Sequence, residues 1–271
     1  IPLERPDHLD GREFLTDEEV AEIERVEGEL AANRLAGLDG TEVGKRTVEE
    51  SPIRGNEYNS FWQDHGRARQ VFSQTSLIVD PPNGKLPYTE DAREAADRSV
   101  ARYGVGPFES YLDPDTGERC LTDGATIMMW QGPNGGHNRI VQSPGYVTIV
   151  HEEYHDRRII PVDGQPPRGV PQWLGDSVGR WEGDTLVVET TNFLRETAAR
   201  GSSKETRLVE RFRRVDADTV VYEFTFEDKS SFTRPWTAVM PLRRTDGPLF
   251  EYACHEGNMG MHGILAGARN L

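Results

Sequence analysis

Two stretches of the chain place apolar residues at the spacing of an α-helix. Thr16-Asp-Glu-Glu19 has the form of a capping box, and apolar residues follow it at intervals of three and four. This pattern predicts an amphipathic helix over residues 17–36. Thr89 can cap a second helix over residues 90–103, in which alanines form a narrow apolar stripe. Both helices are expected to pack on the outside of the remaining fold.

From residue 126 onward, short runs of β-branched and aromatic residues alternate with turn sequences. The predicted strands are Thr126–Gln131, Asn138–Gln142, Tyr146–Tyr154, Arg157–Val162, Val178–Trp181, Thr185–Thr191, Leu208–Val215, Val220–Glu227, Trp236–Arg243 and Leu249–His255. Residues 59–62 and 75–80 have a similar composition and predict two earlier strands.

Tight turns join several of these strands, and no helical crossover separates them. An antiparallel meander of about ten strands must close or stack to protect its edges. We therefore expect a mainly β fold, a calycin-like or lipocalin-like antiparallel barrel with the two helices outside; the alternative is a two-sheet β-sandwich. Residues 1–271 are interpreted as a single domain, with a helical N-terminal arm over 1–55 and the barrel over 56–271.

The charge of the chain narrows the classes of partner. Its 271 residues carry a formal charge of −15, from 46 acidic and 31 basic residues. Such a surface repels nucleic acid and anionic membranes, so neither is expected as a partner. The sequence contains no run of eighteen apolar residues, so no membrane-spanning helix is expected. We expect a small-molecule substrate instead.

The chain has two cysteines, Cys120 and Cys254, far apart in the sequence. A pair with none left over favours one disulfide in an oxidising compartment, and buried reduced thiols are the alternative. The interpretation as a disulfide predicts a periplasmic or secreted protein.

Residues 151–155 match the His-Glu-x-x-His string of zinc proteases. That chemistry requires a helix, whereas the β-branched runs on both sides favour a strand. In a strand, His151, Glu153 and His155 would share one face, which separates the zinc ligands from the adjacent glutamate. We expect the spacing to be a coincidence, although a strand could still hold a divalent metal on His151, His155 and His255, with His137 as a further candidate.

The same segment is dense in ionisable groups, as acid/base sites are. Glu152 and His155 are the candidate general acid or base, and His255, at the end of the last predicted strand, is their candidate partner. Candidate substrate-binding residues, chosen because they stand in or beside these segments, are Asn138, Tyr154, Asp156, Arg157 and Glu256. The nucleotide-binding and serine-hydrolase motifs are absent, so we expect no cofactor.

Several long blocks resemble a large, mostly uncharacterised family of exported proteins of soil and freshwater bacteria. They include SLIVDPPNG at residues 76–84, WEGDTLVVETTNF at 181–193 and YACHEGN at 252–258. In the pattern of that family, the positions of Glu152, His155 and Asp156 recur, and His151 is a departure. By architecture alone, the expected barrel is similar to the calycin-like phenolic acid decarboxylases, which need no cofactor.

These observations lead to three hypotheses of function. The first is a cofactor-independent lyase, for example a decarboxylase, acting on a small aromatic or apolar carboxylic acid in the barrel cavity. The second is a lipocalin-like binding protein without catalysis, in which aromatic residues line a cavity rather than only fill a core. The third is a metal-dependent hydrolase or oxygenase that uses strand-borne histidines.

Overall fold

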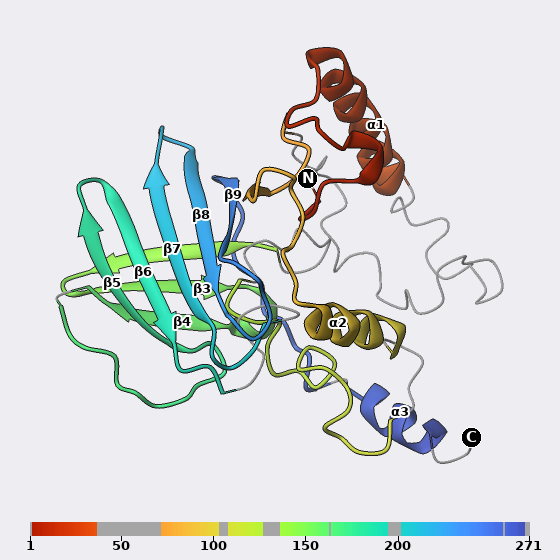
Figure 1. Ribbon diagram of the computed structural model, residues 1–271, viewed down its shortest axis with the longest axis vertical. Helices are drawn as coiled ribbons and strands as arrows, with labels where there is room; N and C mark the ends of the chain where they lie inside the picture. The colour runs from red at the N-terminus through yellow and green to blue at the C-terminus, as the bar shows by residue number, and fades with distance from the viewer. Residues whose placement is uncertain are drawn as a thin grey trace.

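The computed structural model describes residues 2–36, 72–102, 108–126, 136–162, 164–194, 202–256 and 258–268. In these residues, nine strands form two antiparallel sheets, and three α-helices lie to one side of them in the view of Figure 1. The predicted class, a mainly antiparallel β fold, is confirmed.

The larger sheet has six strands in the order β1-β9-β8-β7-β6-β5. From one edge to the other these are β1 (Ile78–Asp80), β9 (Trp236–Arg243), β8 (Thr219–Glu227), β7 (Arg207–Arg214), β6 (Thr185–Thr191) and β5 (Asp176–Glu182). Every pair is antiparallel, so the meander from β5 to β9 is continuous along the chain.

The smaller sheet contains β2 (Asn138–Ser143), β3 (Tyr146–His151) and β4 (Arg157–Pro161), in that order. Its strands cross those of the larger sheet steeply in Figure 1. Val147, Ile149 and His151 alternate with more exposed neighbours along β3, and the buried side chains face the larger sheet's core residues. The two sheets therefore enclose one core between them.

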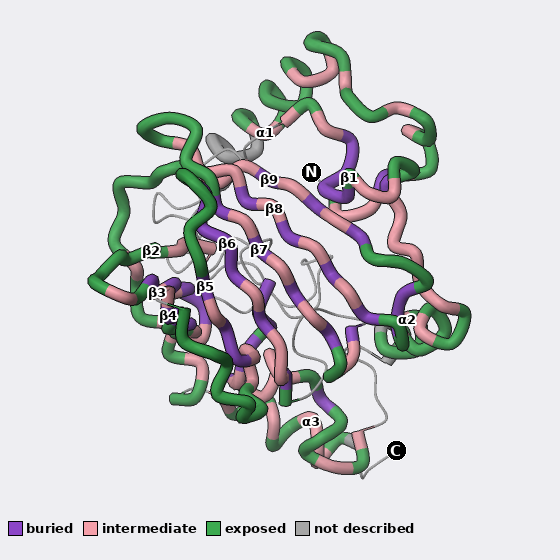
Figure 2. Tube along the Cα trace, turned by 60° about the vertical axis from the view of Figure 1, so that its left-hand side comes forward, coloured by how far each residue is buried: buried purple, intermediate pink, exposed green. Residues whose placement is uncertain are grey.

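The core is filled by aromatic side chains from the larger sheet. Buried residues alternate with less buried ones along β7, β8 and β9 (Figure 2). Phe226 stacks on Trp236 with ring centroids 4.6 Å apart, and Phe212 stacks on Tyr222 at 4.8 Å. These rings pack against one another, so they form a core and do not line a ligand cavity. Two further tryptophans of the sequence, at positions 62 and 130, lie outside the described residues.

The predicted barrel closure is not seen in the described residues. β1 and β5 remain the edges of one sheet, and β2 and β4 remain the edges of the other, an arrangement compatible with the alternative of a two-sheet sandwich. The connection between β4 and β5 carries Pro166, Pro167 and Pro171. Proline has no backbone N–H to donate to a ladder, so β4 and β5 do not continue as a hairpin.

The N-terminal signals for both predicted helices are confirmed. In α1 (Asp17–Ala36), the Glu19 N–H donates to Thr16 Oγ1 at 3.3 Å, and the Thr16 N–H donates to Glu19 Oε2 at 2.8 Å. In α2 (Glu90–Arg102), the Ala92 N–H donates to Thr89 Oγ1 at 3.3 Å. No helix in the described residues is long and apolar enough to cross a membrane.

Three local predictions are wrong or fall outside the described residues. The expected strand over 249–255 is irregular chain and turn, and a third helix, α3 (Gly260–Ala268), which was not predicted, follows it. The expected strand over 126–131 begins in a turn at Thr126, and its remaining residues are not described. The predicted strand over 59–62 is likewise outside the described residues.

Candidate functional site

The His-Glu-x-x-His string lies in a tight turn between β3 and β4. β3 ends at His151, and Glu153–His155 form a short 3-10 turn in which Tyr154 and His155 have φ of 56° and 52°. The His151 N–H donates to Asp156 O at 2.7 Å and closes the turn. The prediction of a strand through Tyr154 is therefore wrong, and so is the shared face of His151, Glu153 and His155. The turn also lacks the helix that the zinc-protease arrangement needs.

Two distant loops cover this turn, and one disulfide joins them. Cys120 and Cys254 form the predicted bridge, with their Cα atoms 5.7 Å apart. On the first loop, the Thr122 hydroxyl donates to Asp156 Oδ2 at 2.5 Å. On the second, the Phe250 N–H donates to Glu152 Oε1 at 2.6 Å. The disulfide thus fixes both loops against the turn.

Glu152 connects the turn to His137 and to the backbone of Phe250. Its side chain is only 5% exposed, and its second oxygen, Oε2, lies 2.9 Å from His137 Nδ1. Both oxygens therefore have partners, one on the Phe250 backbone and one on the His137 ring. A carboxylate that accepts two hydrogen bonds is a good orienting group, and it fixes the position of His137.

His151 is buried, with 2% of its surface exposed, and its two ring nitrogens have different surroundings. Nδ1 lies 2.7 Å from Asn138 Oδ1, and the Asn138 amide nitrogen donates to Gly136 O at 3.4 Å. The Nε2 atom has no hydrogen-bond partner among the described residues. Burial lowers the pKa of His151 from 6.5 to about 4, so the ring is neutral at pH 7.

Two carboxyl groups of the turn keep their protons unusually strongly. Burial, followed by the charge of Asp123, raises the pKa of Glu153 from 4.5 to about 7, although a hydrogen bond from Tyr252 opposes the change. Glu153 Oε2 is buried without a hydrogen-bond partner among the described atoms. Burial also raises the pKa of Asp156 from 3.8 to about 6, against the hydrogen bond from Thr122. Near pH 6.5, Glu153 is mainly protonated and Asp156 mainly ionised.

A small cavity lies beside the turn, on the inner side of the three-stranded sheet. Its volume is about 10 Å³, and its walls include Asn138, His151, Asp156 and Arg158. That volume is on the order of the space one water molecule needs. The cavity can therefore take one polar group of a ligand, and a whole aromatic ring would not enter it.

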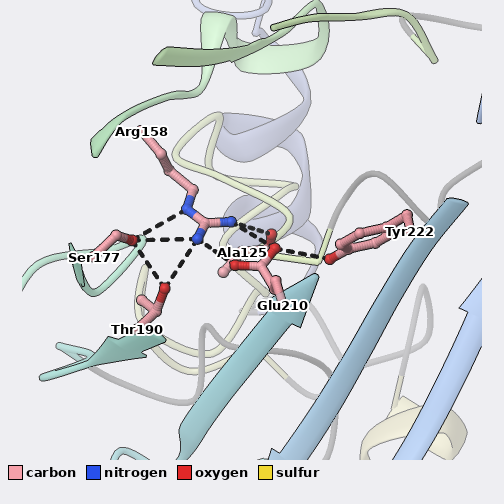
Figure 3. Close-up of polar contacts among 6 residues, drawn as sticks. All are labelled: Ala125, Arg158, Ser177, Thr190, Glu210 and Tyr222. Atoms are coloured by element: carbon pink, nitrogen blue, oxygen red, sulfur yellow. Dashed lines mark hydrogen bonds and ion pairs between the residues drawn. The ribbon is translucent and has the colours of Figure 1, made fainter. Parts of the chain in front are cut away.

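Arg158 lines the cavity. It also belongs to a buried polar network (Figure 3). Its guanidinium makes a two-fold ion pair with Glu210, with one contact of 2.9 Å, and donates to Thr190 Oγ1 at 2.9 Å. The Tyr222 hydroxyl donates to Glu210 Oε1 at 2.8 Å. Contacts to Ser177 and to Ala125 O occupy the remaining N–H groups. Arg158 thus joins β4 to the larger sheet and has no donor left for a substrate.

The remaining candidate residues are less closely connected. His155 is exposed, and its Nε2 accepts the Tyr252 N–H at 3.3 Å. Tyr154 donates to Gly117 O at 3.2 Å, and burial raises its pKa. Arg157 is exposed on the outer side of the small sheet, but its charge lowers the pKa of Asp156.

His255 and Glu256 stand exposed in the turn after Cys254, and their side chains make no hydrogen bond or ion pair with the described residues. The structure therefore does not bring His255 into contact with Glu152 or His155. Among the described parts of the chain, no three His, Cys, Asp or Glu side chains are placed to hold a metal ion, the proposed trio of His151, His155 and His255 included.

Three residues that contribute to this candidate site were not among the candidates chosen from the sequence. Glu153 was passed over in favour of Glu152, and Thr122 and Asp123 were not considered at all. The sequence indicated Thr122 and Asp123 only indirectly. If Cys120 pairs with Cys254, the neighbours of both cysteines must lie close together.

Comparisons with known proteins give no relative for this chain. No family model, no curated protein and no solved structure matches the chain. The resemblance to exported bacterial proteins therefore stays a prediction.

Proposed function

We propose that the protein is a cofactor-independent lyase that moves protons on a small carboxylic acid at the β3–β4 turn. The observation that carries the proposal is the gathering, in one turn beside a cavity, of the buried Glu153 carboxyl, the half-buried Asp156 carboxyl and a buried His151 nitrogen that has no partner among the described residues. Such groups are costly to bury and are characteristic of acid/base sites.

Glu153 and Asp156 supply the two complementary protonation states that such a reaction needs. Between about pH 6 and about pH 7, Asp156 is the ionised base and Glu153 is the protonated acid. In a decarboxylation, CO₂ leaves, the electron pair remains on the substrate carbon, and that carbon takes the proton of Glu153. Solvent then returns a proton to Glu153 through Asp156, which as the base takes up this proton and passes it on.

Glu152 and His155, the residues first expected to act, serve in this proposal as supports. Both oxygens of Glu152 are engaged, and His155 Nε2 accepts a backbone N–H. Their contacts position the loop at residues 250–252 over the turn. The chemistry accordingly moves to their neighbours Glu153 and Asp156.

Two exposed arginines lie beside the turn, on the outer face of the small sheet. Arg139, Val150 and Arg157 lie opposite one another on β2, β3 and β4, and both arginines are exposed. Neither makes an ion pair with the described residues. In a chain of net charge −15, two neighbouring cations favour the approach of a carboxylate at this place over the rest of the surface.

The test is turnover of a panel of small aromatic and aliphatic carboxylic acids, followed by mass spectrometry of the products. A lyase converts one acid to a product lighter by CO₂ or by another small molecule. Glu153→Gln and Asp156→Asn are each expected to lower kcat at least about a hundredfold, because general acid/base catalysis contributes that much or more.

The matched control is Glu227→Gln, which makes the same chemical change on the outer face of the larger sheet, where Glu227 pairs with Arg207 at 2.6 Å. It is expected to keep wild-type turnover. Unchanged kcat in both Glu153→Gln and Asp156→Asn would rule out the proposed roles.

A second candidate function is binding of a small molecule without catalysis. It is favoured by an open hollow of about 220 Å³ beside the disulfide, lined by Tyr111, Arg119, Leu121, Asn258 and Met261. Native mass spectrometry of protein purified without added ligand tests it. A retained compound that the protein never converts would favour this function over a lyase.

A further inference from the structure

The Nε2 nitrogen of His151, which has no hydrogen-bond partner among the described residues, defines a hydrogen-bonding site beside the turn. The Asn138 amide is oriented by its contact to Gly136 O, so its Oδ1 faces His151 Nδ1 at 2.7 Å. An amide oxygen only accepts hydrogen bonds, and Nδ1 must therefore carry the proton of the neutral ring. The other nitrogen, Nε2, is then an acceptor, and it has no donor among the residues that the structure describes.

This acceptor is isolated from solvent. His151 is only 2% exposed, and Nε2 has no partner among the described residues. A buried acceptor without a partner loses a free energy comparable to a hydrogen bond, which makes a donor from a ligand favourable there. His151 also forms part of the wall of the 10 Å³ cavity.

The cavity determines what kind of donor can reach the nitrogen. Its volume of about 10 Å³ admits a group of the size of one water molecule. Ile149 and Leu174 give it apolar walls, and Arg158, which also lines it, has used its donors on Glu210 and its neighbours. A small neutral donor fits this site, and the smallest that a substrate can offer is a hydroxyl group.

We propose that the cavity is the subsite for the hydroxyl group of a small hydroxy acid, which donates its hydrogen bond to His151 Nε2. This inference rests on the proposed function, because it names the substrate class of the same turn. The carboxylate and the rest of the substrate stay outside the cavity.

The experiment is calorimetric titration of the full chain with matched pairs of acids that differ in one hydroxyl: lactate against propionate, and mandelate against phenylacetate. The wild type is expected to bind the hydroxy acid of at least one pair about tenfold more tightly, because one well-formed hydrogen bond contributes about that factor to the affinity. His151→Phe removes the acceptor and is expected to abolish this preference. His151→Gln offers an amide oxygen and is expected to restore part of it, with circular dichroism confirming that both variants fold.

Equal affinity for both members of every pair, no binding of any of these acids, or a preference that survives in His151→Phe would each overturn the proposal. A crystal structure of the complex distinguishes the two sources of a hydroxyl: a water still bound to His151 Nε2 beside the hydroxy acid would also overturn it. Glu153→Gln separates this subsite from the proposed chemistry. It should keep the hydroxyl preference while losing turnover, whereas unchanged turnover with the preference intact would reject the catalytic proposal alone.

Discussion

Replacing Glu153 by glutamine should make the protein more stable at neutral and alkaline pH while it removes the proposed acid. The Glu153 carboxyl is 6% exposed, and burial raises its pKa from 4.5 to about 7. Below pH 4.5 the carboxyl is protonated in both the folded and the unfolded chain, so in that range it does not make the free energy of unfolding depend on pH. As the pH rises from 4.5 to 7, the unfolded chain releases this proton and the folded chain retains it, so the free energy of unfolding falls.

The size of this loss follows from the two pKa values. At about 1.4 kcal/mol per pH unit, the wild type loses roughly 3 kcal/mol between pH 4.5 and pH 8 through this one group. Glutamine has nearly the same shape and does not titrate. The variant should therefore gain up to roughly 3 kcal/mol over the wild type at pH 8 and show almost none of that gain at pH 4.5.

Urea unfolding, followed by tryptophan fluorescence at pH 4.5, 5.5, 7 and 8, measures this difference. His151 and Asp156 also titrate in this range, but they are present in both proteins and largely cancel in the comparison. Glu227→Gln should show a nearly flat difference, because that side chain is paired at the surface. A Glu153→Gln difference that does not change with pH, or that falls as the pH rises, would refute the reasoning.

Three further changes test the supports of the site. Cys254→Ser removes the bridge to Cys120, which closes a loop spanning 134 positions, and should lower the free energy of unfolding by about 2–5 kcal/mol, measured in urea against the oxidised wild type. Arg158→Met leaves Glu210 buried without its ion pair and should cost about 3–5 kcal/mol in the same assay; a loss below about 1 kcal/mol would contradict the buried network. Gly175→Ala should lower Tm by several degrees, because Gly175 has φ of +72° and an added Cβ would lie 2.5 Å from Thr190 Cγ2; an unchanged Tm would show that the backbone relaxes there.

The parts of the fold that depend on neighbouring residues could be predicted from the sequence. The capping residues Thr16 and Thr89 marked the starts of α1 and α2, and the β-branched runs marked most strands to within a few residues. How the sheets close is decided by contacts between distant segments. Gly179 on β5, where an added Cβ would lie 2.9 Å from Val162 Cγ1, shows how closely the end of β4 passes it, and no local pattern predicts that approach.

The site was predictable as a segment and not as a set of roles. The positive φ of Tyr154 has no signal in the sequence, because a bulky aromatic residue rarely adopts it, so the turn was mistaken for a strand. The strand expected around Phe250 fails because its N–H groups bond to turn side chains in place of a ladder. Glu152 and Glu153 are neighbours of identical chemistry, and only the loops brought in by the disulfide decide which carboxyl is satisfied and which is left to hold a proton.

The central claim is that a carboxylic acid in the β3–β4 turn remains protonated near neutral pH. A ¹³C NMR titration of the glutamate side-chain carboxyls in the full chain, with Glu153→Gln to assign the resonance, measures this directly. The account predicts a midpoint for Glu153 of about 7, well above the ordinary value of 4.5. A midpoint near 4.5 would contradict it and remove the proton donor on which the proposed function depends.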